Sequence, residues 1–86
     1  MEITYDPSKN LLNIRHRNLS FEQVAEFDFE TAIFTVDKRK DYREIRRCAL
    51  GYLGNRLHAL VFTETPNGMR IISFRKANKR EIASYE

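Results

Sequence analysis

The residues best suited to chemistry lie near the end of the chain, in Arg70-Ile-Ile-Ser-Phe-Arg75-Lys76-Ala-Asn-Lys79-Arg80-Glu81. Five cations and no acidic residue precede Glu81 in this stretch. A strand over residues 69–74, followed by a short helix, would hold these cations and Tyr85 on ordered backbone. Positive charge held in place binds phosphate well. The pattern therefore predicts a site for a polyanion.

A carboxylate belongs to a second candidate group, in the strand-like stretch 44–53. Alternation along a strand would place Glu44 and Arg46 on one face, together with Cys48 and Leu50. If this strand lies opposite the strand of Arg70, Glu44 stays ionised among cations and can accept a proton. A cross-strand ion pair on a solvated sheet is the simpler alternative.

The two arginines of the last strand differ by an odd number of positions. In a regular strand Arg70 and Arg75 point to opposite faces, unless a bulge or the strand end re-aims Arg75. Otherwise Arg75 would brace the final helix or contact a partner. Arg70 shares its parity with Ile72 and Phe74, so a helix could also bury its face.

Histidine and cysteine chemistry is limited. His16 lies between two arginines at the end of a predicted helix, where it either exchanges protons near neutral pH or is simply solvated. His58 lies in the most apolar strand and is expected to be structural. Two isolated histidines and one cysteine give no metal-ligand spacing, and no phosphate-binding glycine loop is present. The sequence therefore predicts neither a metal nor a cofactor.

The overall composition is that of one small globular domain. The 86 residues are 42% hydrophobic and 31% charged, which suffices for a single core over residues 1–86. No apolar run is long enough to span a membrane and no signal peptide is apparent, so we expect a cytoplasmic protein without membrane contact.

Periodicity and capping signals predict an α+β fold with the element order β-α-α-β-β-β-β-α. Asp6 and Pro7 should begin a helix that ends near Asn18, with Leu11, Leu12 and Ile14 as its apolar face. A capping box at Ser20 should begin a second short helix. The remaining elements are expected at 2–5, 31–37, 44–53, 56–64, 69–75 and from 79 onward. The strand over 56–64 should be central, with helices covering one side.

The available groups suit one reaction that needs no metal, the cleavage of RNA by its own 2′-hydroxyl. Such an enzyme removes the hydroxyl proton, neutralises charge on the phosphorane and protonates the leaving oxygen. Cations, a carboxylate and an imidazole or phenol could supply these functions.

Several motifs occur in an order that is found in a known family. They are Tyr5-Asp6-Pro7-x-Lys9, Ser20-Phe21-Glu22, Glu44-x-Arg46 and Arg70-Ile-Ile-Ser-x-Arg75-Lys76-Ala-x-x-Arg80-Glu81 with Tyr85-Glu86 following. On these residues the chain resembles the BrnT toxins of bacterial type II toxin-antitoxin modules. It departs from them at His16-Arg17-Asn18, where the family usually has Lys-His-Gly, and at Phe74, where the family has alanine.

The resemblance implies a RelE-like antiparallel sheet with two N-terminal helices and a short C-terminal helix. It further implies a metal-independent endoribonuclease that cleaves messenger RNA and arrests growth. In this interpretation Glu44 is the proton acceptor or an orienting group, and Arg46 and Arg70 clamp the phosphate. His16 and Tyr85 complete the catalytic group. The RNA-binding cations would be Arg75, Lys76, Lys79 and Arg80.

The resemblance also implies partners. A BrnA-like antitoxin would neutralise the toxin, in an assembly that could be a heterotetramer, and promoter DNA would be contacted only through the antitoxin. Because the segment His16-Arg17-Asn18 is altered, a weak or inactive module that binds RNA or antitoxin is an open alternative. A purely structural subunit is another.

Overall fold

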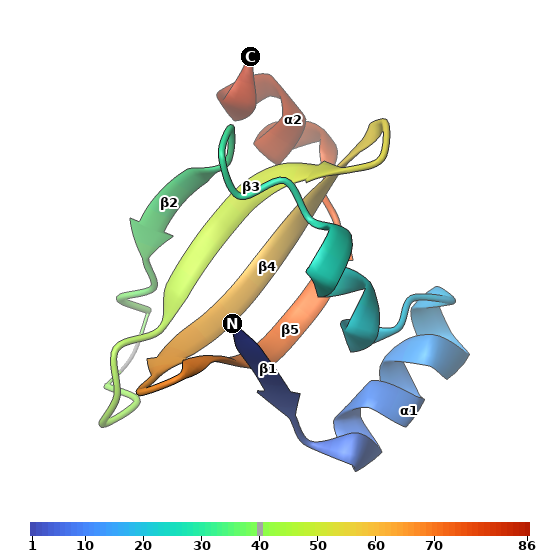
Figure 1. The fold of residues 1–86 in the computed structure, drawn as a ribbon. Coiled ribbons are helices and arrows are strands. Elements are labelled where there is room, and N and C mark those ends of the chain that lie inside the picture. Colours follow the sequence, from blue (N-terminus) through green and yellow to red (C-terminus); the bar gives the residue numbers. More distant parts are fainter. Residues whose placement is uncertain (40) are drawn as a thin grey trace.

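A computed structural model describes residues 1–39 and 41–86, so Lys40 of the predicted charged loop lies outside the described residues. The chain forms an α+β fold around a five-stranded sheet with the strand order β1-β5-β4-β3-β2 (Figure 1). In chain order the elements are β1 (Glu2–Tyr5), α1 (Pro7–Arg17), η1 (Phe21–Glu26), β2 (Ile33–Val36), β3 (Arg47–Leu53), β4 (Arg56–Thr65), β5 (Gly68–Lys76) and α2 (Lys79–Tyr85). The predicted class and element order are confirmed.

Most of the sheet is an antiparallel meander, as predicted. Strands β2 to β5 pair consecutively through hairpins, and β4 is central. The sheet is nevertheless mixed, because β1 pairs with β5 in parallel. A parallel pair requires a long crossover connection, and here everything between β1 and β5 supplies it.

Local capping fixes the N-terminal elements where the sequence predicts them. The Asp6 carboxylate accepts a hydrogen bond from the Ser8 N–H at 2.9 Å, and Asn18 ends α1 in the left-handed conformation at φ 53°. Ser20 and Gln23 form the expected capping box of η1. This element is a six-residue 3₁₀ helix rather than an α-helix.

The predicted apolar face of α1 is wrong. Leu11, Leu12 and Ile14 are 66%, 51% and 39% exposed, whereas Asn10 and Asn13 are buried. The reason is that α1 lies against unpaired backbone groups rather than against an apolar face. Buried backbone groups need hydrogen-bond partners, and amide side chains provide them.

Two asparagines thereby join three segments of the chain. Asn13 Nδ2 donates to the carbonyl oxygens of Leu19, at 3.0 Å, and of Phe74, at 2.9 Å. Asn10 Oδ1 accepts from the Phe21 N–H at 2.8 Å. Since β1 pairs with β5 only as far as Ile71, Asn13 provides a partner for β5 where β1 has ended.

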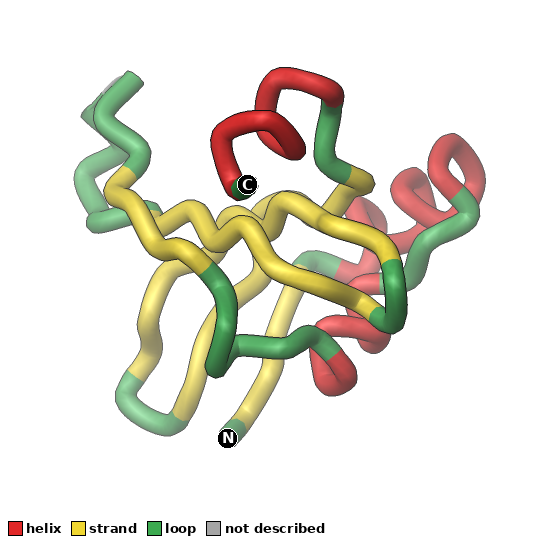
Figure 2. The backbone as a smooth tube through the Cα atoms, turned by 90° about the horizontal axis from the view of Figure 1, so that it is seen from above, coloured by secondary structure: helices red, strands yellow, loops and turns green. Residues whose placement is uncertain are grey.

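The core lies between the sheet and the N-terminal segments. Its fully buried large side chains are Phe21, Val24, Leu60, Ile71 and Phe74. Helix α2 lies apart from α1 and η1 (Figure 2). It makes its contacts with other parts of the chain. No helix among the described residues is long and apolar enough to cross a membrane.

We expect Asn13→Ala to lower the free energy of unfolding by about 2 to 4 kcal/mol, because it leaves two buried carbonyl groups without a partner. Leu11→Ala on the exposed side of the same helix should change it by about 0.5 kcal/mol or less. Urea unfolding followed by circular dichroism measures both. Equal losses in the two variants would show that Asn13 is not the anchor of α1.

Candidate functional site

A β-bulge decides where the arginines of β5 point. Val61 of β4 lies opposite Ser73, but the next residue, Phe62, lies opposite Ile71, so Ile72 is an extra residue in β5. Arg70 is paired with Thr63 and Arg75 with Ala59. Thr63 and Ala59 are four positions apart in β4, so they share a face, and so do the two arginines.

The same bulge decides whether Arg70 lies on the buried face of the sheet. Phe74 and Ile71 are both buried in the core, while Arg70 points to the other face of the sheet with its side chain 42% exposed. The parity of Arg70 with Phe74 is broken by the extra residue. None of the helices in the described part of the chain buries this arginine.

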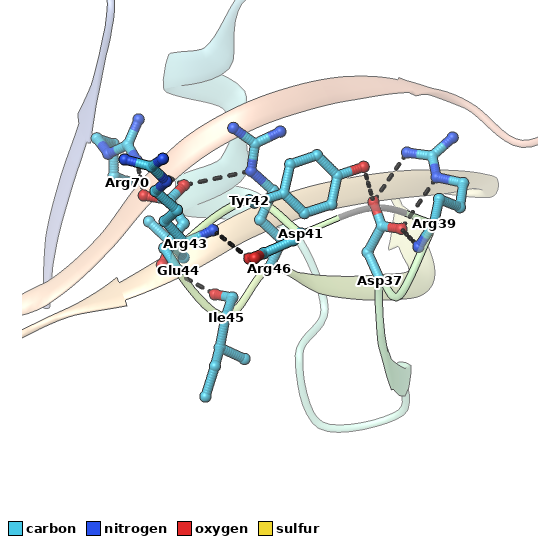
Figure 3. A network of polar contacts seen from close by, with 10 residues as sticks. Asp37, Arg39, Asp41, Tyr42, Arg43, Glu44, Ile45, Arg46 and Arg70 are labelled. Atoms are coloured by element: carbon cyan, nitrogen blue, oxygen red, sulfur yellow. Dashed lines mark hydrogen bonds and ion pairs between the residues drawn. The ribbon is translucent and has the colours of Figure 1, made fainter.

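Glu44 lies between two arginines on this face (Figure 3). Arg70 Nη2 donates to both Glu44 oxygens, at 2.8 and 2.9 Å, and Arg46 Nε donates to Glu44 Oε2 at 3.2 Å. The structure thus brings together Glu44, Arg46 and Arg70. The predicted strand was too long, because β3 begins only at Arg47, so Glu44 and Arg46 reach the sheet from the preceding loop.

This loop is tied to the sheet close to the carboxylate. The Thr63 hydroxyl donates to the Ile45 carbonyl at 3.0 Å. Glu44 and Arg46 therefore lie over the same face because of the loop conformation, and not because of the strand alternation that the sequence predicted.

The arginines change the acidity of Glu44. The Arg46 hydrogen bond, with smaller contributions from Arg70, holds the pKa of the Glu44 carboxyl below its usual range. Its side chain is only 31% exposed. At neutral pH Glu44 is therefore a carboxylate, a weak base, and a group that fixes the positions of two guanidinium groups.

The charged cluster extends through residues that the sequence did not single out. The Arg46 guanidinium carbon lies 4.0 Å from the centre of the Tyr42 ring, a cation–π contact. The Tyr42 hydroxyl donates to Asp37 at 3.2 Å, and the Arg39 guanidinium group donates two hydrogen bonds to the same carboxylate. These contacts hold the pKa of the Asp37 carboxyl far below its usual range, mainly through Arg39. The only sequence signal for Tyr42 was an aromatic residue among charges.

A cleft of about 450 Å³ begins at this cluster and extends along the sheet. Its lining includes Arg39 and Arg46 from the loop after β2, and Ser73 and Arg75 from β5. Arg75 makes two hydrogen bonds, of 2.7 and 2.9 Å, to the Glu81 carboxylate of α2. The Glu81 contact raises the pKa of Arg75 and lowers that of Glu81, so both remain charged. Arg75 thus lines the cleft and also braces the final helix.

His16 belongs to a neighbouring hollow of about 430 Å³. Lys9 and Arg17 also line it, and it shares Ile72 and Ser73 with the first cleft. The two hollows therefore meet at the bulge of β5, with cations on both sides. Arg17 and Lys76 lie close to Arg75 in a third, smaller hollow.

The other predicted site residues lie outside the Glu44 cluster. Lys79 and Arg80 are exposed in the first turn of α2. The Tyr85 hydroxyl donates to the Thr31 carbonyl at 2.9 Å, and its ring packs edge-on against Tyr52. In this arrangement Tyr85 ties α2 to the segment before β2.

The remaining reactive side chains are poor candidates for chemistry. Cys48 lines the cleft, but burial raises the pKa of its thiol, which disfavours the thiolate. His58 is buried against Phe74, and desolvation lowers its pKa, so it is a neutral core residue. Within residues 1–39 and 41–86, no three histidine, cysteine or acidic side chains are placed to hold a metal ion.

The family of the chain is shown by one comparison. A family model described as "Ribonuclease toxin, BrnT, of type II toxin-antitoxin system" matches residues 5–81, nearly the whole chain. A search of curated proteins found no match.

We expect the pKa of Glu44 to rise toward the ordinary value of a glutamate in Arg46→Ala and in Arg70→Ala, because each variant removes a cation that favours the carboxylate. Titration of the side-chain carboxyl by NMR measures this. Arg56→Ala, at the opposite end of the β3–β4 hairpin, is the control and should leave the pKa unchanged. An unchanged pKa in both test variants would mean that the cluster does not persist in solution.

Proposed function

The chain belongs to the BrnT family of ribonuclease toxins of type II toxin-antitoxin systems, and on this premise we propose that it is a metal-independent endoribonuclease. The substrate would be messenger RNA, cut by attack of the RNA's own 2′-hydroxyl. Loss of messenger RNA in the cytoplasm would inhibit translation and growth.

The observation that carries this proposal is the clamp of Glu44 between Arg46 and Arg70. Two guanidinium groups held in place can neutralise charge that develops on a pentacoordinate phosphorane, and they need no reorganisation to do so. The protein's own cations would thereby perform the task that a metal ion performs in other nucleases.

The role of Glu44 follows from its acidity. Because its pKa is lowered, Glu44 is a weaker base than an ordinary glutamate. It would hold the arginines and the 2′-hydroxyl in place, and it would accept the hydroxyl proton as the bond from the 2′-oxygen to phosphorus forms and the bond to the leaving 5′-oxygen breaks. His16, across the bulge from Arg75, is the imidazole that would transfer a proton to the leaving oxygen.

The two hollows would bind the RNA backbone on either side of the reacting phosphate. Arg75 and Lys76 would add further cations to this surface, and Lys79 and Arg80 would continue it onto α2. Such binding weakens as the salt concentration rises, because the displaced counterions are more favourably released at low salt. Tyr85, held by Thr31, would act at the end of this surface by stacking on a base.

A type II toxin has an antitoxin partner, and we propose a BrnA-like protein in this role, in a heterotetramer. DNA would be contacted only through the antitoxin.

One observation supports the alternative of a weak or inactive toxin that binds RNA. Arg17, in the segment that departs from the family, donates to Asn13 Oδ1 at 2.6 Å, so this cation has a structural contact. In that case RNA would bind without being cut.

We expect the purified protein to cut a labelled RNA in the presence of EDTA, and to leave uncut the same RNA with a 2′-deoxy nucleotide at the cleaved position. Arg70→Ala should slow single-turnover cleavage by about 10²- to 10³-fold, because it removes a preorganised cation. Glu44→Ala should slow it by about 10²- to 10³-fold as well, because it removes the proton acceptor and the group that holds two guanidinium groups in place. Arg56→Ala, an exposed arginine outside the cleft, is the matched control and should cut at the parent rate.

Each other result has a definite meaning. Binding without cleavage by the folded parent protein would favour the inactive module. Cleavage that is lost in EDTA and restored by Mg²⁺ would contradict metal independence. Parent-like cleavage by Arg70→Ala would remove the clamp from the mechanism.

A further inference from the structure

Strand β2 is an outer strand of the sheet (Figure 1). Its free edge is apolar and uncharged. Its four residues are Ile33, Phe34, Thr35 and Val36, and the three apolar ones are 46%, 47% and 43% exposed. Among the described residues, no strand pairs with its outer side. Natural edge strands usually carry charges, proline or a bulge that prevents pairing with another chain, and β2 has none of these within its length.

The ladder register shows which backbone groups lie on this edge. The Asp37 N–H donates to the Arg46 carbonyl directly opposite at 2.8 Å. Hydrogen-bonded and non-hydrogen-bonded pairs alternate in an antiparallel ladder, so Thr35 and Ile33 also bond toward β3. The N–H and C=O groups of Phe34 and Val36 therefore point outward, spaced as another strand would need them.

The opposite edge of the sheet is different. Strand β1 begins with the charged Glu2, and η1 packs beside it. The Tyr5 ring lies edge-on to Phe21 at 5.7 Å, and its hydroxyl donates to Glu22 at 3.2 Å. The edge of β2 is thus the less protected of the two.

Positive charge continues from this edge into the cleft. Thr35 and Val36 line the cleft together with Lys38 and Arg39, and the Arg39 side chain is 79% exposed. A strand added along β2 would therefore end beside cations of the proposed RNA-binding surface. Acidic residues at that end would be favoured.

We propose that the free edge of β2 binds an extended segment of the antitoxin as an added strand, with acidic side chains of that segment next to Lys38 and Arg39. This inference rests on the proposed function, because the family provides the antitoxin as the protein partner. A protein segment fits better than RNA, since only a protein presents N–H and C=O groups at the strand repeat together with apolar side chains for Ile33 and Phe34.

The test uses Phe34→Pro and its matched control Phe34→Ala. Both lose the Phe34 ring and its edge-on contact with Phe62, but only proline removes the outward N–H, which forms no bond to β3. Affinity for the purified BrnA-like antitoxin is measured by calorimetry. We expect Phe34→Pro to bind at least about tenfold more weakly than Phe34→Ala, because it loses a main-chain hydrogen bond and places its ring against the incoming strand. Parent-like circular dichroism and urea unfolding in both variants show that they fold.

Hydrogen exchange of the parent protein gives a second result that needs no variant. The amides of Phe34 and Val36 should exchange quickly in the toxin alone and become protected in the complex with antitoxin. Protection in the toxin alone that grows with its concentration would instead assign the edge to a second copy of the chain. Protection by RNA would assign it to RNA, and either result overturns the proposal.

The failures of the two proposals are distinguishable. If the parent protein binds the antitoxin while Phe34→Pro binds as well as Phe34→Ala and the two amides stay unprotected, strand addition is wrong but the toxin's function stands. If the folded parent protein does not bind the antitoxin at all, both this inference and the proposed partner are wrong. Neither result depends on whether the protein cuts RNA.

Discussion

The extra residue in β5 is the constraint on which both the core and the candidate site depend. Ile71 and Phe74 are three positions apart, yet both are buried in the core, and Arg70 and Arg75 are five positions apart, yet both point to the other face. A regular strand would allow neither arrangement, because alternate residues face opposite sides. The bulge at Ile72 allows both at once, and it also forms the boundary between the two cation-lined hollows.

The site holds its arginines by pairing each with a carboxylate. Arg46 and Arg70 share Glu44, Arg39 binds Asp37, and Arg75 binds Glu81. This pairing fixes the guanidinium groups before a substrate arrives, which favours catalysis because little reorganisation is needed. It also means that a phosphate has to compete with carboxylates for the same donors. Glu44 shares two arginines, so each of them keeps donors for another anion.

Local signals in the sequence predicted the ends of the elements well. Asp6, Asn18 and Ser20 occupy the capping positions that their side chains suit, because a cap depends on only a few neighbouring residues. The inward face of α1 was not predictable in this way. It depends on which backbone groups of β5 and η1 lack partners, and only the assembled fold shows that.

The candidate site was predictable in its residues but not in its geometry. Charge and spacing selected Glu44, Arg46 and Arg70, and the structure brings all three together. The sequence placed Glu44 in a strand, since Glu44 to Arg46 continue an alternating pattern, whereas the Thr63 hydroxyl and two arginines hold these residues as a loop. A bulge leaves no clear signal in a run such as Ile71-Ile72, because both residues suit either face.

The position of the free edge of β2 suggests how an antitoxin could inhibit without reaching Glu44. The edge lies beside Thr35 and Val36, which line the cleft, while the Glu44 clamp is held on the sheet by Arg70. A strand on β2 would place acidic side chains among Lys38 and Arg39, and these side chains would compete with RNA for cations of the proposed RNA-binding surface. Inhibition of this kind acts on substrate affinity and leaves the clamp intact. The same toxin surface would then serve both proposed partners, because the uncharged edge suits a protein strand and the neighbouring cations suit an anion.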